Sequence, residues 1–283
     1  MAMGPMIENR TSRAADAGRG GVAARLLCSV AVFLIALSGC GKDSYLTEPE
    51  GPVVSVEFGE GIEVITPSDT LVRFFEDFTP VTFQDRPAIL LRNLVGEDVV
   101  EFPDLYGYRF VGVDGFYANM PGKGYGDNTW DQLTIGYLDL TDVRIVFETE
   151  RDPNLRNGHN VKWLVRAEVL RSVDVVWSGG RNLVAVTEVE TATVPEGVPG
   201  AGADGVVLTT FVEEGGPSDL VPDQYVYRVS ARDGQGLPRL LTWAEMGAAY
   251  YLPGDDRVVM SEALGSAYQV DRPKTIRMEA KVR

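Results

Sequence analysis

The sequence predicts an α+β protein made of two tandem β-rich units with short helices. Three observations carry this prediction. The 283-residue chain is 45% hydrophobic, which is enough for a sizeable core. Short apolar runs with period-two alternation are typical of strands. The segment YGYRFVGVDG at 106–115 recurs as YVYRVSARDG at 225–234, and such a recurrence indicates a structural unit used twice.

The recurring segment predicts a strand followed by a turn. In each copy, aromatic or apolar side chains alternate with a face that carries an arginine, as expected of a strand. Asp114-Gly115 and Asp233-Gly234 come next, and Asp and Gly tolerate the positive φ that a tight turn needs. We therefore interpret both aspartates as turn residues rather than catalytic ones.

A short helix is predicted downstream of each strand. Thr129 with Gln132, and Thr242 with Glu245, fit the capping box that satisfies backbone amides at a helix start. Side chains spaced i, i+3, i+7 then predict one buried aromatic stripe on each helix. The stripes comprise Trp130, Leu133 and Tyr137 in the first helix, and Trp243, Met246 and Tyr250 in the second.

Further segments recur in the same order. Apolar runs open at Arg144 and Arg257 and predict buried strands. A closing strand is expected after Val161 and again after Lys274, and the two closing strands align with Val165 opposite Ile276. The segment 88–95 corresponds to 205–212, before the opening motif of each copy. These matches favour a duplication.

The boundaries follow from composition. Residues 191–204 are rich in Pro and Gly and predict a linker. The first unit then covers 53–190 and the second, shorter unit covers 205–283.

The N-terminal segment, residues 1–39, is predicted to be an export signal. Leu26 to Leu37 is almost wholly apolar but spans only about 18 Å as a helix, short of the roughly 30 Å of a bilayer core. Leu37-Ser38-Gly39-Cys40 follows and resembles the lipobox of bacterial lipoproteins. The alternative is an ordinary secretory signal with a chance cysteine.

The lipobox resemblance implies that the signal is cleaved, that the cysteine is acylated and that the protein is located at a membrane. In that family the cysteine is acylated after cleavage, so Cys40 would carry diacylglyceryl and palmitate-type chains and anchor the protein durably. Residues 40–52 then form a flexible tether. Gly41 after the cysteine implies the outer membrane facing the periplasm, or otherwise the outer face of the plasma membrane.

Charge and cysteine content exclude several functions. The formal net charge of −15 repels nucleic acid. Cys28 would leave with the signal and Cys40 would be lipidated, so the mature chain has no disulfide, no thiolate nucleophile and no Cys/His metal site.

The segment NVKWLVRAEVL at 160–170 resembles the closing strand of the molybdopterin-binding domain of sulfite-oxidase-like oxidoreductases. Residues 86–95, 108–121 and 143–148 resemble earlier parts of that domain. The resemblance covers about 85–170 and is fainter over 205–283. It implies a sulfite-oxidase molybdopterin-domain-like fold in both units.

The departures from that family argue against a molybdenum centre. The family binds molybdenum through a cysteine thiolate, and no cysteine follows Cys40. DPNLRNGHN at 152–160 replaces the basic segment before the closing strand, leaving only Lys162. We therefore expect no cofactor and no metal.

Six residues are candidate ligand contacts. The repeated arginines could bind an anionic ligand, the sole histidine could occupy a former cofactor pocket, and Lys162 is the basic residue that remains of the family segment. The six are Arg109, Arg144, His159, Lys162, Arg228 and Arg257. The alternatives are arginines paired with nearby carboxylates and a solvated loop histidine. Nothing in the spacing of the acidic residues singles out a catalytic pair or a calcium site.

The expected protein is therefore a lipid-anchored envelope protein with two cofactor-free domains that act as a binding or scaffolding module rather than an enzyme. Its expected partners are the membrane, through the lipid, and an envelope protein or a small ligand. The alternative is a membrane-anchored oxidoreductase subunit that binds a pterin or another organic cofactor.

Overall fold

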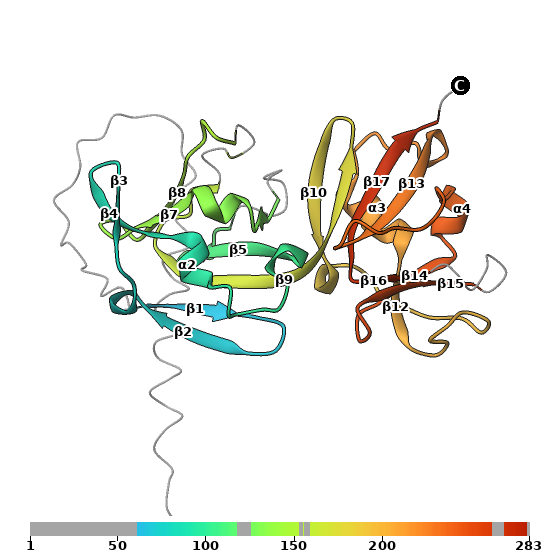
Figure 1. Ribbon diagram of the computed structural model, residues 1–283, viewed down its shortest axis with the longest axis horizontal. Helices are drawn as coiled ribbons and strands as arrows, with labels where there is room; N and C mark the ends of the chain where they lie inside the picture. Colours follow the sequence, from blue (N-terminus) through green and yellow to red (C-terminus); the bar gives the residue numbers. More distant parts are fainter. Residues whose placement is uncertain (1–60, 118–125, 153–154, 156–158, 262–268, 282–283) are drawn as a thin grey trace, which may run out of the picture. The chain divides into compact units, whose positions relative to one another are not determined.

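The computed structural model describes residues 61–117, 126–152, 155, 159–261 and 269–281. These residues form a strand-rich α+β fold with three sheets and short helices (Figure 1). The predicted α+β class is confirmed.

The largest sheet runs through both halves of the described chain in the order β13-β17-β9-β1-β2, with β5, β6 and β10 attached to it. Its strands are β1 (Gly61–Ile65), β2 (Thr70–Phe74), β5 (Tyr106–Gly112), β6 (Asn128–Thr129), β9 (Leu164–Trp177), β10 (Gly180–Ala185), β13 (Tyr225–Ala231) and β17 (Pro273–Ala280).

Two smaller antiparallel sheets complete the strands. One consists of β3 (Val81–Phe83), β4 (Arg86–Leu90), β7 (Gly136–Asp139) and β8 (Arg144–Phe147). The other consists of β11 (Ala192–Thr193), β12 (Asp204–Val207), β14 (Ala249–Leu252), β15 (Arg257–Met260) and β16 (Val270–Asp271).

The helices are short. The α-helices are α2 (Leu91–Val95), α3 (Leu208–Gly215) and α4 (Trp243–Met246). The 3-10 turns are η1 (Phe75–Asp77), η2 (Pro103–Leu105), η3 (Gln132–Ile135), η5 (Val186–Glu188) and η6 (Pro222–Gln224).

β9 supplies both hydrophobic cores. Ala167 and Val169 pack in the first core, with side chains from β1, α2, β5, β7 and β8. Val173 and Val175 pack in the second core, with side chains from α3, β13, β14 and β17. The change from one core to the other therefore falls inside β9, near Ser172.

Residues 191–204, expected to be a linker, carry β11 and bury Val194 and Val198 against the second small sheet.

The two halves share an irregularity in strand pairing. Between β5 and β9 the register shifts where Val111 lies opposite Arg166 and Gly112 opposite Leu164. Between β13 and β17 it shifts at the corresponding place, Ser230 opposite Thr275 and Ala231 opposite Pro273. Such a bulge bends a strand and redirects its side chains.

The matched registers correct the alignment of the closing strands. Arg166 corresponds to Thr275, so Val165 does not correspond to Ile276, and the sequence alignment was wrong by two residues. Trp163 and Arg272 precede the shift in each half, and both have positive φ, at 52° and 49°.

The turns after β5 and β13 form as predicted. Gly115 and Gly234 have φ of 77° and 81°. The Asp114 carboxylate accepts a hydrogen bond from the amide of Phe116, and Asp233 accepts one from Gln235. Both aspartates therefore stabilise turns, as inferred.

The capping boxes form, but the helices are shorter than predicted. The Thr242 hydroxyl accepts a hydrogen bond from the Glu245 amide at 3.3 Å, and Thr129 accepts one from Gln132 at the same distance. Tyr137 and Tyr250 lie in β7 and β14 rather than in helices, so the extended stripes were wrong. Each helix ends after a single turn because the following residues form β7 and β14, which pair with β4 and β12.

Each tryptophan packs on a buried tyrosine. The Trp130 and Tyr108 ring centroids are 5.6 Å apart, and those of Trp243 and Tyr227 are 5.5 Å apart. The tyrosine hydroxyls donate to the carbonyl oxygens of Pro103 and Pro222, at 2.8 and 3.0 Å. Both tryptophans are half-buried rather than largely buried.

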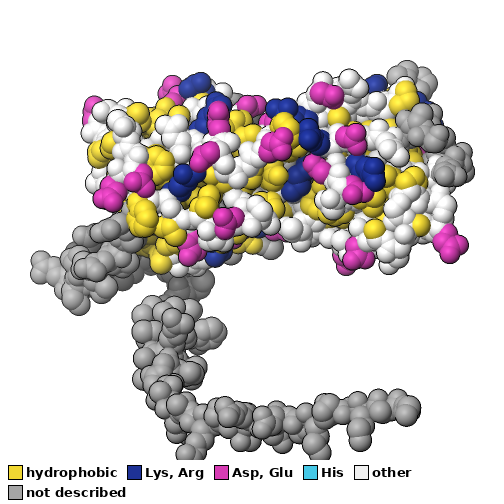
Figure 2. Space-filling view, turned by 60° about the horizontal axis from the view of Figure 1, so that its bottom comes forward, with side chains coloured by type: hydrophobic (Ala, Val, Ile, Leu, Met, Phe, Trp, Pro, Cys, Tyr) yellow, Lys and Arg dark blue, Asp and Glu magenta, His cyan; other side chains and the backbone are white. Residues whose placement is uncertain are grey.

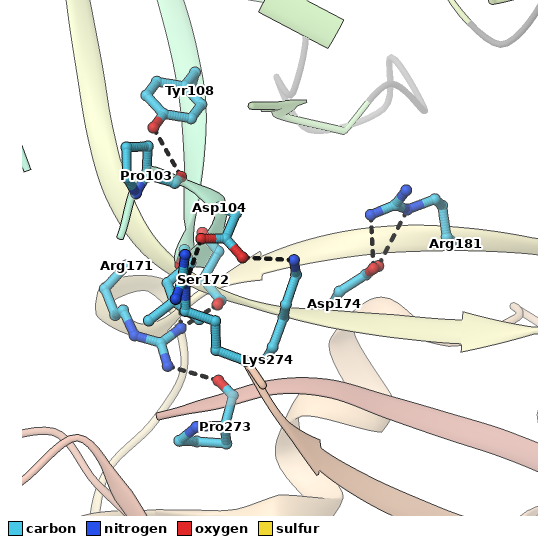
Figure 3. A network of polar contacts seen from close by, with 11 residues as sticks. Pro103, Asp104, Tyr108, Arg171, Ser172, Asp174, Arg181, Pro273 and Lys274 are labelled. Carbon is cyan, nitrogen blue, oxygen red and sulfur yellow. Dashed lines mark hydrogen bonds and ion pairs between the residues drawn. The ribbon is translucent and has the colours of Figure 1, made fainter. Parts of the chain in front are cut away.

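A polar joint connects the two halves beside β9 (Figure 3). The Arg171 guanidinium donates to the carbonyls of Leu105 and Pro273 and pairs with Asp256 at 2.8 Å. Asp104 pairs with Lys274 at 2.8 Å and with Arg232 at 2.7 Å. Burial alone would raise the pKa of Asp104, but these two cations hold it below its ordinary value.

Tyr108→Phe and Tyr227→Phe should each destabilise the protein by about 1 to 2 kcal/mol, because each removes the hydrogen bond from a buried tyrosine to a partly buried proline carbonyl. Urea unfolding of the full chain measures both. Tyr225→Phe is the control, since its hydroxyl makes no hydrogen bond with the described residues, and it should change stability by less than about 0.5 kcal/mol. A large difference between the two buried tyrosines would contradict their equivalence.

Arg171→Met should cost about 2 to 4 kcal/mol, because it leaves Asp256 and three backbone carbonyls without their cation. The partial exposure of Asp256 keeps the cost below that of a fully buried pair. Hydrogen exchange should speed up in β5 and β13 together. Arg228→Met, which removes an exposed ion pair, should cost less than about 1 kcal/mol. Loss of protection in only one strand would argue against a joint that couples the halves.

Candidate functional site

A polar pocket of about 720 Å³ lies between η3, the segment that holds His159, and the β9–β10 hairpin. Pockets that hold small molecules commonly have this size. We call it the His159 pocket, and its principal lining side chains are Gln132, Arg151, Asp152, His159, Trp177 and Arg181.

His159 is the buried wall of this pocket. Its Nδ1 lies 3.2 Å from Oδ1 of Asn128, and its ring meets the ring of Phe147 edge-on at 6.2 Å. Burial lowers the pKa of His159, with Asp152 opposing the shift. The imidazole is therefore neutral at physiological pH, and this side chain is not the solvated loop histidine considered from the sequence.

The capping residue Gln132 links η3 to the pocket. Its Oε1 accepts from the Thr129 amide, and its Nε2 donates to Asp152 at 2.9 Å. The same side chain therefore starts a helical turn and orients a pocket carboxylate.

The opposite wall comes from the β9–β10 hairpin. Trp177 and Arg181 flank its turn, and Arg181 pairs with the buried Asp174 at 2.6 Å. Burial raises the pKa of Asp174, although Arg181 partly counters this. Arg181 remains more than half exposed and can meet a ligand from solvent.

Arg109 does not line this pocket and lies in a buried ion cluster. It forms a two-pronged pair with Asp127, both bonds at 2.9 Å, and a second pair with Glu188. Glu168 lies 3.8 Å from its Nη1. Burial alone would lower the pKa of Arg109, but the hydrogen bonds to Glu188 and Asp127 raise it above its ordinary value. This arginine organises carboxylates of its own chain.

The other predicted contacts lie apart from the His159 pocket. Arg228, at the strand position equivalent to Arg109, is exposed and pairs with Glu279 at 3.0 Å. Arg257 pairs with Asp255 at 2.7 Å. Lys162 is exposed before β9, and Arg144 lies on β8 beside a separate groove. The six candidates are not brought into one site.

Ion pairs between neighbouring side chains are a general feature of the surface. Figure 2 shows dark blue and magenta groups interspersed over one face of the described chain. Such mixing fits arginines that are matched to nearby carboxylates rather than gathered into one cationic patch.

Several site residues were missed from the sequence. Trp177 and Arg181 reach the pocket through the β9–β10 hairpin, and the Ser-Gly-Gly run after Trp177 was the available signal for that turn. Asp127 was not singled out among the many acidic residues of the sequence. Its pairing with Arg109 depends on folding across the sheet and has no local signature.

The proposed signal, Cys40 and the tether lie outside the described residues. Among the residues that the structure describes, no cluster of three or more His, Cys, Asp or Glu side chains could hold a metal ion. In the same ranges, no helix has the length and apolar character needed to span a membrane.

Comparisons with protein-family models, curated proteins and solved structures gave no match to this chain.

The neutral state of His159 predicts a pH-dependent stability. Because folding lowers its pKa, the unfolded chain takes up the proton first as pH falls, so stability should decline below about pH 6.5. His159→Gln should remove this part of the pH dependence while keeping a polar group beside Asn128. Urea unfolding between pH 8 and pH 5 measures it, and parallel curves for the two proteins would show that His159 does not contribute.

Proposed function

We propose that this chain is a lipid-anchored protein of the bacterial envelope that works as a binding module, with the His159 pocket as its ligand site. The single observation that carries the proposal is the pocket itself. It combines an indole, an accessible guanidinium and a buried neutral imidazole in a volume that suits a small molecule.

The pocket chemistry favours a small polar ligand with an anionic group and a planar part. The exposed Arg181 offers charge and hydrogen bonds, while Trp177 offers a flat apolar surface. Asp152 can accept a hydrogen bond from the ligand.

His159 suits binding better than proton transfer. Its Nδ1 is engaged with Asn128, and its low pKa favours the neutral ring near pH 7. A neutral imidazole in this position orients a ligand through hydrogen bonding.

The finer fold assignment is part of the proposal. Two degenerate copies of a molybdopterin-binding-domain-like unit would explain why the same bulge, turn and tyrosine–proline bond occur in both halves. The residues present do not fit a molybdenum centre. Cys28 and Cys40 are the two cysteines of the sequence, and both precede the described ranges. Lys162, the remaining basic residue of the family segment, is exposed away from the pocket.

A second candidate is a membrane-anchored oxidoreductase subunit that binds a pterin or another organic cofactor. The volume of the His159 pocket supports it, since a planar ring of that size could lie against Trp177.

Extraction of the full chain from the membranes of its host separates the two candidates. A binding module should give a colourless protein without stoichiometric metal, whose small-molecule ligand is detected by native mass spectrometry. Arg181→Glu should remove the ligand, and Arg228→Glu, the same charge reversal on an exposed paired arginine, should retain it. A stoichiometric pterin absorption band would favour the oxidoreductase, and retention of ligand by Arg181→Glu would contradict the site.

The lipid anchor is tested on the same preparation. Intact mass should correspond to a chain that begins at Cys40 with added acyl groups, and Cys40→Ser should leave the membrane fraction. If the Cys40→Ser chain still partitions wholly with membranes, the anchoring proposal fails.

A further inference from the structure

The two small sheets have matching outer faces. Tyr137 lies opposite Val146 across β7 and β8, as Tyr250 lies opposite Val259 across β14 and β15. The neighbouring pairs, Asp139 with Arg144 and Leu252 with Arg257, keep the same register. Val146 and Val259 therefore occupy equivalent positions on the side of each sheet that faces away from its main core.

The outer face of the second sheet is covered by its own chain. Residues 195–202, which connect β11 to β12, fold over β14 and β15, and we call this segment the strap. Val198 in the strap packs with Val194, Leu252 and Val259, and Val259 has no exposed surface. Positive φ at three glycines lets the strap turn back on the sheet; they are Gly197, Gly200 and Gly202.

Among the residues that the structure describes, no segment covers the first sheet as the strap covers the second. A two-residue turn at Gln84 and Asp85, with φ of 49° and 62°, connects β3 directly to β4. Phe83 stacks on Tyr137 with ring centroids 4.1 Å apart. Beside this stack, a groove of about 380 Å³ passes over Val146, which stays half-exposed. We call it the β8 groove.

The charges of the two faces also differ. Asp255 pairs with Arg257 in the second half. The equivalent carboxylate in the first half, Asp142, pairs with Arg86 instead at 2.9 Å. Arg144 forms no ion pair within the described ranges, and its Nε has no hydrogen-bond partner there. The β8 groove therefore contains one arginine without an ion pair in the described ranges, beside two carboxylates, Asp139 and Asp142, that both pair with Arg86.

We propose that the β8 groove binds an extended, acidic, proline- and glycine-containing segment of a partner protein. The segment covers Val146 with a branched apolar side chain, as Val198 covers Val259, and places a carboxylate on Arg144. The strap shows which kind of segment fits the equivalent face of the second sheet, because its Val198 packs on Val259. The proposal goes beyond the ligand site, because Val146 and Arg144 do not line the His159 pocket.

The test uses a fluorescently labelled peptide with the sequence of residues 193–203, TVPEGVPGAGA, titrated into the full chain in detergent micelles. This probe contains Val194, the strap residue Val198 and one glutamate, Glu196. In the second half the strap is part of the same chain, so its high effective concentration prevents the peptide from displacing it. Binding of the peptide therefore reports on the β8 groove. We expect saturable binding, and the peptide with Glu196→Lys should bind at least about tenfold more weakly.

Arg144→Glu should weaken peptide binding by at least about tenfold, and Arg228→Glu should leave it unchanged. Val146→Asp tests the apolar contact, and matching circular dichroism spectra establish that each variant is folded. If Val146→Asp does not fold, the affinity of Arg144→Glu for the peptide still tests the proposal, because Arg144 is partly exposed and its substitution should be tolerated. Equal affinity in the wild type and Arg144→Glu, or no saturation up to about 1 mM, would overturn the proposal.

Two other occupants give distinct results. A second copy of the chain would appear in sedimentation as a dimer that Val146→Asp dissociates. A lipid surface would appear as vesicle flotation of Cys40→Ser that the same substitution removes. Either result would overturn the partner-peptide proposal while leaving ligand binding in the His159 pocket to be judged by Arg181→Glu.

Discussion

The fourteen-residue strand β9 is the constraint on which both halves of the described chain depend. It pairs antiparallel with β5 and β10 and parallel with β1 and β17. Side chains at alternate positions along it enter first one core and then the other. Because one strand is common to both cores, every element that packs on either core is positioned relative to β9, including the hairpin that walls the His159 pocket.

The polar joint explains how a strand can pass from one core to the next. Ser172 is buried but belongs to neither core, and beside it Arg171 binds carbonyl oxygens from both halves. The Phe102 ring contacts the guanidinium groups of both Arg232 and Arg272, whose Cζ atoms lie 4.6 and 4.1 Å from the ring centroid. Cation–π contacts and ion pairs thus satisfy polar groups where apolar packing changes over.

Local chemistry could be predicted from the sequence, and long-range pairing could not. The Asp-Gly turns and Thr caps depend on residues within a few positions of one another, so their signatures were readable. The lengths of the helical turns could not be predicted, because strand pairing with β4 and β12 outweighed the helical periodicity around Tyr137 and Tyr250. The pocket was missed for the same reason: Trp177 and Arg181 are close to His159 only after β10 folds onto β9.

The position of β1 has a mechanical consequence. β1 lies between β2 and β9 and is the first described strand, so a chain held at Cys40 would transmit a pull on its anchor into β1 before any other described element. Tension along a strand that is hydrogen-bonded on both sides loads those bonds together in shear, whereas an edge strand pulled sideways opens one bond at a time. The interior placement of β1 therefore makes the proposed point of attachment resistant to force, and strain from the envelope would be borne by the same sheet that holds both cores together.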